Sequence, residues 1–246
     1  MFRSSNPIFK QDLAGTRSFS STEAMTVQGT VNCIGFLLVL VVFSASWVWN
    51  KFFNLGPQAI NGYMMLGLFG GFITALITVF KKDLAKYTAA IYALFEGLFL
   101  GGISAVFEAN YPGIVIQAVG LTFGVMFTML FVYKSGIIKV NNKFRIGIIA
   151  ATGGIALIYL VSMIMGFFGG GLSIISSSSP LGIGFSFVVV AIAAFNLVLD
   201  FDYIEQGAAY GLPKDMQWYF AFGLIVTLVW LYIEILRLIS KLNQRR

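Results

Sequence analysis

Ser186-Phe-Val-Val-Val-Ala-Ile-Ala-Ala-Phe-Asn-Leu-Val-Leu199 is followed directly by Asp200, and the run Phe220-Ala-Phe-Gly-Leu-Ile-Val-Thr-Leu-Val-Trp-Leu-Tyr-Ile233 is followed directly by Glu234. Apolar runs of this kind are typical of membrane-spanning helices. A carboxylate in hydrocarbon costs roughly 2.5–3.5 kcal/mol even on lenient insertion scales, so it normally faces a bundle interior and finds a partner there. The two carboxylates therefore mark a candidate path for ions or protons.

The composition of the whole chain supports the same class of protein. Of its 246 residues 58% are hydrophobic and only 11% are charged, and the mean hydropathy is +0.87. Soluble domains carry about 25% charged residues, so the chain is predicted to be an integral membrane protein. The net charge of +6 fits loops that face anionic lipid, and we expect no nucleic-acid partner.

Several kinds of chemistry are excluded by missing residues. The chain has no histidine, which removes histidine bases, zinc-protease motifs and haem ligation. Cys33 is the only cysteine, so neither a disulfide framework nor a thiolate metal cluster is expected. A retinal protein would need a lysine within the last span, whereas Lys241 lies at its very end. No Gly-x-Gly-Asp motif of intramembrane aspartyl proteases occurs. We expect neither enzyme activity nor a cofactor.

Seven apolar segments are long enough to span a membrane. Residues 1–28 are polar and lack the apolar core of a signal peptide, so we expect a cytoplasmic tail before a transmembrane domain at 29–246. Gly- and Pro-containing turns separate the segments. The predicted spans are Val31–Asn50, Ala59–Phe80, Tyr87–Phe107, Ile114–Tyr133, Ile146–Phe168, Leu181–Asp200 and Trp218–Leu236.

The basic residues predict the orientation. With the N-terminus inside, eleven of the sixteen lysines and arginines fall on the cytoplasmic side, as the positive-inside rule requires. We therefore expect a multi-pass membrane protein with its N-terminus in the cytoplasm. The basic C-terminus falls on the opposite side, which a seventh helix that is short, re-entrant or buried among the others would reconcile. The residues on that opposite side are Lys51, Arg237, Lys241, Arg245 and Arg246.

Three pairs of glycines are spaced by four residues, which allows helix backbones to approach closely in lipid. We predict that all three serve packing within the chain rather than a dimer interface. The pairs are Gly67/Gly71, Gly97/Gly101 and Gly120/Gly124.

A polar stripe follows one face of the last segment, through Thr227, Trp230, Glu234, Arg237 and Lys241. The stripe is typical of a central helix that lines a polar core. The alternative is a local ion pair between Glu234 and Arg237, with Arg237 reaching the membrane interface.

Three further polar residues are candidates for supporting roles at this site. Asn196 and Asp200 stand four apart on one helical face, whereas Asp202 is expected at the cytoplasmic surface. Glu96 lies near mid-span, one turn after Tyr92, and is either a neutral, hydrogen-bonded acid or a third acid on the path. Carboxylate oxygens are the ligands of hard cations, so Asp200 and Glu234 are candidate Ca²⁺ ligands.

The chain resembles the transmembrane Bax inhibitor motif family, in particular a bacterial subgroup, which implies a location in the bacterial plasma membrane. The stretches that carry the resemblance are Leu197-Val-Leu-Asp-Phe-Asp-Tyr-Ile-Glu-Gln-Gly-Ala208, Trp230-Leu-Tyr-Ile-Glu-Ile-Leu-Arg-Leu-Ile239 and Leu94-Phe-Glu-Gly-Leu-Phe-Leu-Gly-Gly-Ile-Ser104. The resemblance implies six helices around a central C-terminal helix. It also implies a pH-sensitive calcium leak gated by a carboxylate dyad, which here would be Asp200 and Glu234.

Two features depart from the family pattern. The second acid of the dyad is usually Asp, and the separation between Asp200 and Glu234 is longer than usual. If the intervening turn is short, the two acids differ in depth by roughly 13 Å. Two other functions suit buried acids in this fold. One is a proton-coupled secondary transporter, and the other is a non-transporting regulator that binds another membrane protein such as a protease.

Overall fold

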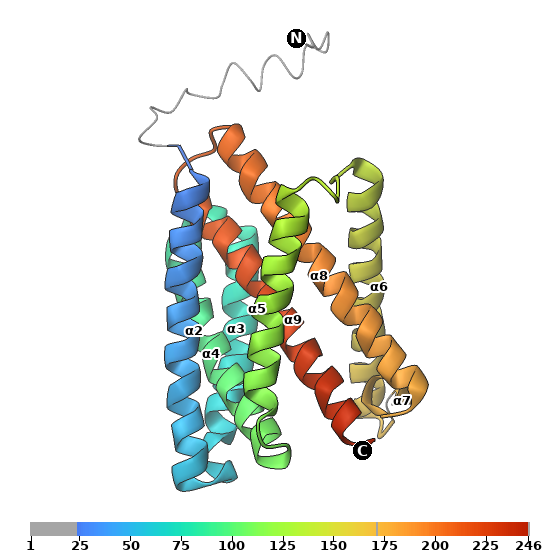
Figure 1. Cartoon of the computed structure of the whole chain (residues 1–246). Helices are drawn as coiled ribbons and strands as arrows, with labels where there is room; N and C mark the ends of the chain where they lie inside the picture. Colours follow the sequence, from blue (N-terminus) through green and yellow to red (C-terminus); the bar gives the residue numbers. More distant parts are fainter. Residues whose placement is uncertain (1–23, 171, 246) are drawn as a thin grey trace.

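The structure, a computed structural model, describes residues 24–170 and 172–245, and this part of the chain forms seven long helices (Figure 1). Each of the seven is long and apolar enough to cross a membrane. The predicted all-α membrane fold with seven spans is therefore confirmed. The long helices are α2 (Val27–Leu55), α3 (Asn61–Phe80), α4 (Ala85–Asn110), α5 (Ile114–Lys134), α6 (Asn142–Phe167), α8 (Pro180–Ala209) and α9 (Met216–Asn243), and the short ones are η1 (Pro57–Ile60), η2 (Lys82–Leu84) and α7 (Ser173–Ser176).

Most of the long helices extend beyond the apolar segments that predicted them. The largest extensions are at the last two helices: α8 continues past Asp200 to Ala209, and α9 runs on to Asn243. Residues 1–23 of the predicted tail lie outside the described residues. Met25, however, is buried, and its N–H donates to the carbonyl of Leu212 at 2.7 Å. The helical domain therefore begins before residue 29, because this segment packs against the turn between α8 and α9.

Side-chain caps fix several helix starts. Thr26, Asn141 and Ser179 each accept a hydrogen bond from the backbone N–H three residues further on. Glu108 has a similar role across the turn between α4 and α5. Its two carboxylate oxygens accept from backbone N–H groups at Gly113 and at the start of α5, at 2.6 and 3.1 Å. These polar groups therefore accept hydrogen bonds from backbone N–H groups at the helix starts that have no partner within the helix.

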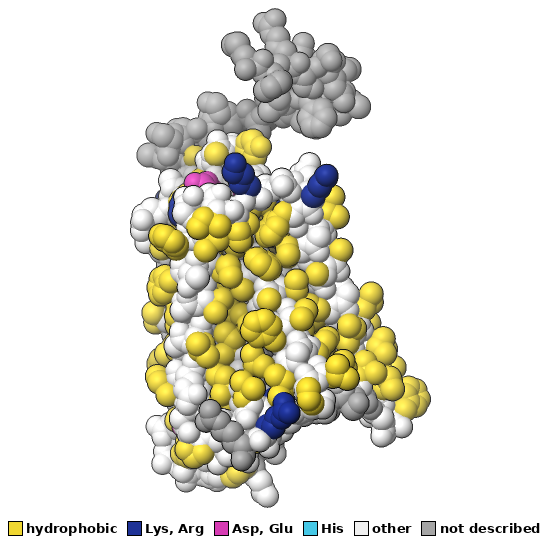
Figure 2. Space-filling model, turned by 45° about the vertical axis from the view of Figure 1, so that its right-hand side comes forward, with side chains coloured by type: hydrophobic (Ala, Val, Ile, Leu, Met, Phe, Trp, Pro, Cys, Tyr) yellow, Lys and Arg dark blue, Asp and Glu magenta, His cyan; other side chains and the backbone are white. Residues whose placement is uncertain are grey.

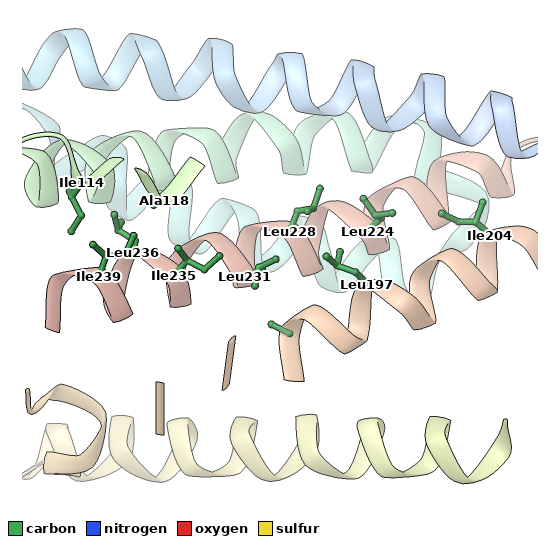
Figure 3. Close-up of a cluster of buried hydrophobic side chains, with 11 residues drawn as sticks. Ile114, Ala118, Leu197, Ile204, Leu224, Leu228, Leu231, Ile235, Leu236 and Ile239 are labelled. Atoms are coloured by element: carbon green, nitrogen blue, oxygen red, sulfur yellow. The ribbon is translucent and has the colours of Figure 1, made fainter. Parts of the chain in front are cut away.

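α9 is the central helix of the bundle (Figure 1). It packs against α2, α4, α5 and α8, and half of its apolar window is buried, compared with 11% for α6. α3 packs mainly on α4, and α6 mainly on α8. Figure 3 shows the buried side chains that join α9 to α8 and α5, with Leu228 and Leu231 of α9 among them. The predicted arrangement around a central C-terminal helix is confirmed.

The chain crosses the bundle so that α2 begins and α9 ends at opposite ends of it (Figure 1). We call the end at which α2, α4, α6 and α9 begin the upper end, as drawn in Figure 1. Of the options for the seventh segment, the structure has the buried one, because α9 is a full 28-residue helix among the others. Lys241, which the sequence placed on the outer side, is buried with 2% of its surface exposed.

The outer surface is apolar around the middle of the bundle. In Figure 2 hydrophobic side chains cover the face in view, and basic side chains appear toward its two ends. Many large hydrophobic residues are exposed, among them Phe43, Phe72, Phe131 and Leu181. In a membrane this surface meets hydrocarbon, so its exposure carries no cost.

Two of the three glycine pairs serve packing within the chain, as predicted. A methyl group on Gly67 would lie 2.6 Å from the carbonyl oxygen of Phe95 on α4, and one on Gly97 would overlap Ser44 of α2. The prediction is wrong for Gly120 and Gly124, where an added methyl group meets nothing within 4 Å. These two glycines lie on an exposed face of α5 that no other described helix covers.

The glycine contacts lead to a matched test of stability. We expect Gly97→Ala to lower the free energy of unfolding by about 1–3 kcal/mol, because the added methyl forces α2 and α4 apart. Gly120→Ala should leave it unchanged or raise it by up to about 1 kcal/mol, because alanine favours the helix. The unfolding midpoints of both variants in the same detergent measure the difference. Equal shifts for the two variants would contradict the packing described above.

Candidate functional site

α6 carries a seam of residues at seven-residue spacing that faces the rest of the bundle. Its buried apolar members are Ile148 and Ile155. Polar side chains alternate with these two isoleucines along the seam, and each of the polar side chains meets a residue that the sequence had proposed for the site. The contacts are Arg145 Nη2 to Asp202 Oδ2 at 2.9 Å, Asn196 Nδ2 to Thr152 Oγ1 at 2.8 Å, and Tyr159 OH to Glu234 Oε1 at 2.9 Å.

Glu234 is the most deeply buried carboxylate among the described residues, with 2% of its surface exposed. Its Oε1 accepts from Tyr159 OH and from Arg237 Nη1, each at 2.9 Å. Arg237 also donates to Tyr159 OH at 3.0 Å, and its guanidinium lies 5.3 Å from the centre of that ring. The local ion pair between Glu234 and Arg237, which the sequence analysis gave as the alternative for this stripe, is present. Glu234 Oε2 is buried with no hydrogen-bond partner.

Lys241 adds a second positive charge to the region around Glu234. Its Nζ donates to the carbonyl of Gly182 at 3.0 Å and to Ser186 Oγ at 2.8 Å, both in the first turns of α8. The lower part of α9 thus holds two cations for one carboxylate. Among the described residues no group of three or more His, Cys, Asp or Glu side chains could hold a metal ion together. Glu234 therefore does not sit in a multi-carboxylate cation site.

Asp200 lies in a different environment, on the wall of a cavity of about 530 Å³ between α3, α4, α8 and α9. One carboxylate oxygen, Oδ2, is buried with no hydrogen-bond partner. Thr227 of α9 is a polar neighbour of this carboxyl group. Asp200 stands nine residues before the last residue of α8, which places it roughly 14 Å from the upper end.

Asp200 and Glu234 are not brought together. Glu234 follows Thr227, the α9 neighbour of Asp200, by seven residues and so lies about 10 Å further along the helix. The buried side chains of Leu228 and Leu231 occupy the turns between them (Figure 3). The contact implied by the family resemblance is absent because the turn between α8 and α9 is short. The extra residues lengthen both helices instead of forming a longer loop.

The acid at the level of Asp200 is Glu96. It stands eleven residues after the start of α4, roughly 17 Å from the upper end. Its neighbour Tyr92 is buried and also lines the Asp200 cavity, where its ring meets Phe222 edge to face at 4.9 Å. The Glu96 carboxylate lies against Gly71 of α3. Tyr92 therefore neighbours Glu96 on its own helix and shares the cavity wall with Asp200.

Asn196 and Asp202 have structural contacts that the sequence did not reveal. Asn196 faces α6 through Thr152 and does not line the Asp200 cavity. Asp202, expected at the surface, is buried and is held by Arg145 and by Gln206 Nε2 at 2.6 Å. Both residues therefore join α8 to α6.

Tyr159, Tyr203 and Tyr219 were missed by sequence reasoning. Tyr159 completes the shell of Glu234, and the other two line the Asp200 cavity. The seven-residue spacing of Arg145, Thr152 and Tyr159 is the signal that could have found the first of them. The cavity tyrosines have no such signal, since aromatic residues are common throughout the apolar segments.

Comparison with known families identifies one match over nearly the whole chain. A family model described as Bax inhibitor 1 like matches residues 6–244. A comparison with curated proteins finds no match.

The Glu234 cluster leads to a prediction about stability. Arg237→Gln should lower the free energy of unfolding by about 2–3 kcal/mol, because it leaves the buried Glu234 charge with only the Tyr159 hydroxyl. The double variant Glu234→Gln with Arg237→Gln should recover much of that loss, since no buried charge is left unpaired. Unfolding midpoints in detergent measure both.

The exposed pair of Lys134 and Glu205, 3.1 Å apart, provides the control. Lys134→Gln should change the stability by less than about 1 kcal/mol. A loss for Arg237→Gln no larger than for Lys134→Gln would show that the buried pair does not hold α9.

Proposed function

The chain belongs to the Bax inhibitor 1-like family of multi-pass membrane proteins, and we propose that it is a pH-sensitive cation leak channel with Ca²⁺ as its ion. The observation that carries this proposal is the Asp200 carboxylate, with one buried, unpartnered oxygen at a cavity near the upper end of the bundle. We place the upper end in the cytoplasm of a bacterial cell, since most of the loop lysines and arginines lie there.

Asp200 is suited to attract a cation. A buried oxygen without a partner is costly, and a passing cation would satisfy it. Carboxylate oxygens and hydroxyls are ligands that Ca²⁺ accepts, and Thr227 adds a hydroxyl beside Asp200. Glu96, beyond Tyr92, adds a second negative charge at the same depth. In this proposal a hydrated cation enters the cavity and loses part of its water at Asp200.

In this proposal the lower half of α9 closes the ion path. A cation that leaves Asp200 first meets Leu228 and Leu231, which fill the space between α9 and α8. It then meets the region of Glu234, where Arg237 and Lys241 exceed the single acid by one positive charge. Both features oppose a cation, so the arrangement corresponds to a closed path. Opening requires Arg237 to leave Glu234.

Two separate carboxylates give the leak two opposite responses to pH. A proton on Glu234 removes the charge that holds Arg237, so acidification favours opening. A proton on Asp200 removes the charge that attracts the cation, so acidification also reduces entry. Flux should therefore pass through a maximum as the pH is lowered. In this mechanism each acid takes up its own proton independently, whereas two acids in contact would share one proton.

Calcium flux into proteoliposomes, measured against pH, tests the proposal. Asp200→Asn should lower the flux roughly tenfold or more at neutral pH, because the cavity loses its attracting charge, and the difference from wild type should shrink on acidification as Asp200 takes up a proton. Glu234→Gln should raise the flux at neutral pH and remove the rise on acidification, because Arg237 is no longer held. Glu205→Gln is the matched control, since Glu205 lies on the same helix but pairs with Lys134 at the surface.

Unchanged flux in both variants would reject the two-carboxylate mechanism. Solute uptake driven by an imposed proton gradient would instead indicate a proton-coupled transporter. A pure protein without flux that captures another membrane protein, such as a protease, would indicate a non-transporting regulator.

A further inference from the structure

The cavity beside Asp200 is much larger than a single metal ion requires. Its volume of about 530 Å³ falls in the range of pockets that hold small organic ligands, about 300–1,000 Å³. Five aromatic rings and one carboxylate dominate its wall: Tyr92, Tyr203, Tyr219, Phe220, Phe222 and Asp200. The remaining wall is aliphatic or glycine.

The aromatic wall attracts positive charge. Ring faces bind ammonium and guanidinium groups within about 6 Å of the ring centre. Two of these rings already do so, with Lys82 Nζ 5.0 Å from the centre of Tyr219 and Arg145 Cζ 5.1 Å from that of Tyr203. Both cations belong to elements at the upper end of the bundle.

The charge balance leaves Asp200 available to a ligand. Arg145 is neutralised by Asp202 at 2.9 Å, and Lys82 belongs to η2 at the upper end. Glu96, beside Tyr92 on α4, is a second acid in this region. Asp200 Oδ2 itself is buried and has no hydrogen-bond partner. A purely apolar occupant would leave that oxygen unsatisfied, which is costly in a low-dielectric site.

We propose that this cavity is a binding site for a lipophilic organic cation, such as a quaternary ammonium, phosphonium or protonated amine with aromatic or alkyl groups. The charged centre pairs with Asp200, and the apolar groups lie among the aromatic rings. Ca²⁺ alone would not fill such a site, because it takes six to eight oxygen ligands and rings supply none. The inference uses the same cavity as the proposed function but does not depend on ion flux.

Tetraphenylphosphonium binding to the full chain in phosphatidylcholine nanodiscs tests the site, with empty nanodiscs subtracted. We expect saturable binding of one cation per chain. Tetraphenylborate has nearly the same shape and the opposite charge, and it should not bind saturably. Asp200→Asn should weaken tetraphenylphosphonium binding roughly 30-fold, the loss expected for a buried charge pair. Glu205→Gln on the same helix should leave it unchanged.

The aromatic wall is tested separately. Tyr203→Leu should weaken binding several-fold more than Tyr203→Phe, which keeps the ring. Equal binding of tetraphenylborate, or no effect of Asp200→Asn in a monodisperse protein, would overturn the proposal. So would the absence of saturable binding to wild type. If Asp200→Asn proves unfolded, the comparison of the two ions on wild type and the Tyr203 pair still decide.

The outcome separates this inference from the proposed leak. Binding without calcium flux would leave the site in place and reject the leak. Flux that depends on Asp200, with no tetraphenylphosphonium binding and no block by it, would reject the site and keep the leak.

Discussion

A polar group within hydrocarbon must find its partner inside the chain, and the rest of this structure depends on how Glu234 meets that requirement. Tyr159 and Arg237 both bond to one of its oxygens, so a single carboxylate joins α6 to α9. Apolar packing alone would not select this position for α6, because lipid chains are as apolar as leucine. The polar seam of α6, with Arg145 and Thr152 in its upper part, therefore determines where the helix docks.

The charge along α9 and its neighbours changes sign from one end to the other. Toward the upper end the acids without a cationic partner are the half-buried Asp200 and Glu96, with aromatic side chains beside them. Past Leu228 and Leu231 the excess is positive, because Arg237 and Lys241 face one Glu234. An asymmetric profile of this kind favours entry of a cation and opposes its passage. In the proposed function, regulation must therefore act on the cluster of Glu234, Arg237 and Lys241.

Length and composition were sufficient to predict seven spans, because apolar runs report membrane burial directly. The central last helix was predicted from its polar stripe and from the family resemblance. The ion pair of Glu234 and Arg237 was also predictable, since residues three apart on a helix are neighbours. Contacts between different helices could not be predicted in this way. Asn196 and Asp202 face α6, and Gly120 and Gly124 face no helix, because one sequence does not specify which helices are neighbours. Tyr159 was missed because its meaning depends on the register of α6 against α9.

The separation between Asp200 and Glu234 follows from how the chain uses its extra residues. Because α8 runs on to Ala209 and α9 starts at Met216, Asp200 lies nine residues from the turn and Glu234 eighteen, so the two acids lie at different depths. Two carboxylates in contact share a proton and titrate as a pair. At about 10 Å, with leucines between, each acid instead responds to its own partners. In the proposed function Asp200 can then attract the cation while Glu234 keeps the path closed by holding Arg237. Neither role requires that the other acid be protonated.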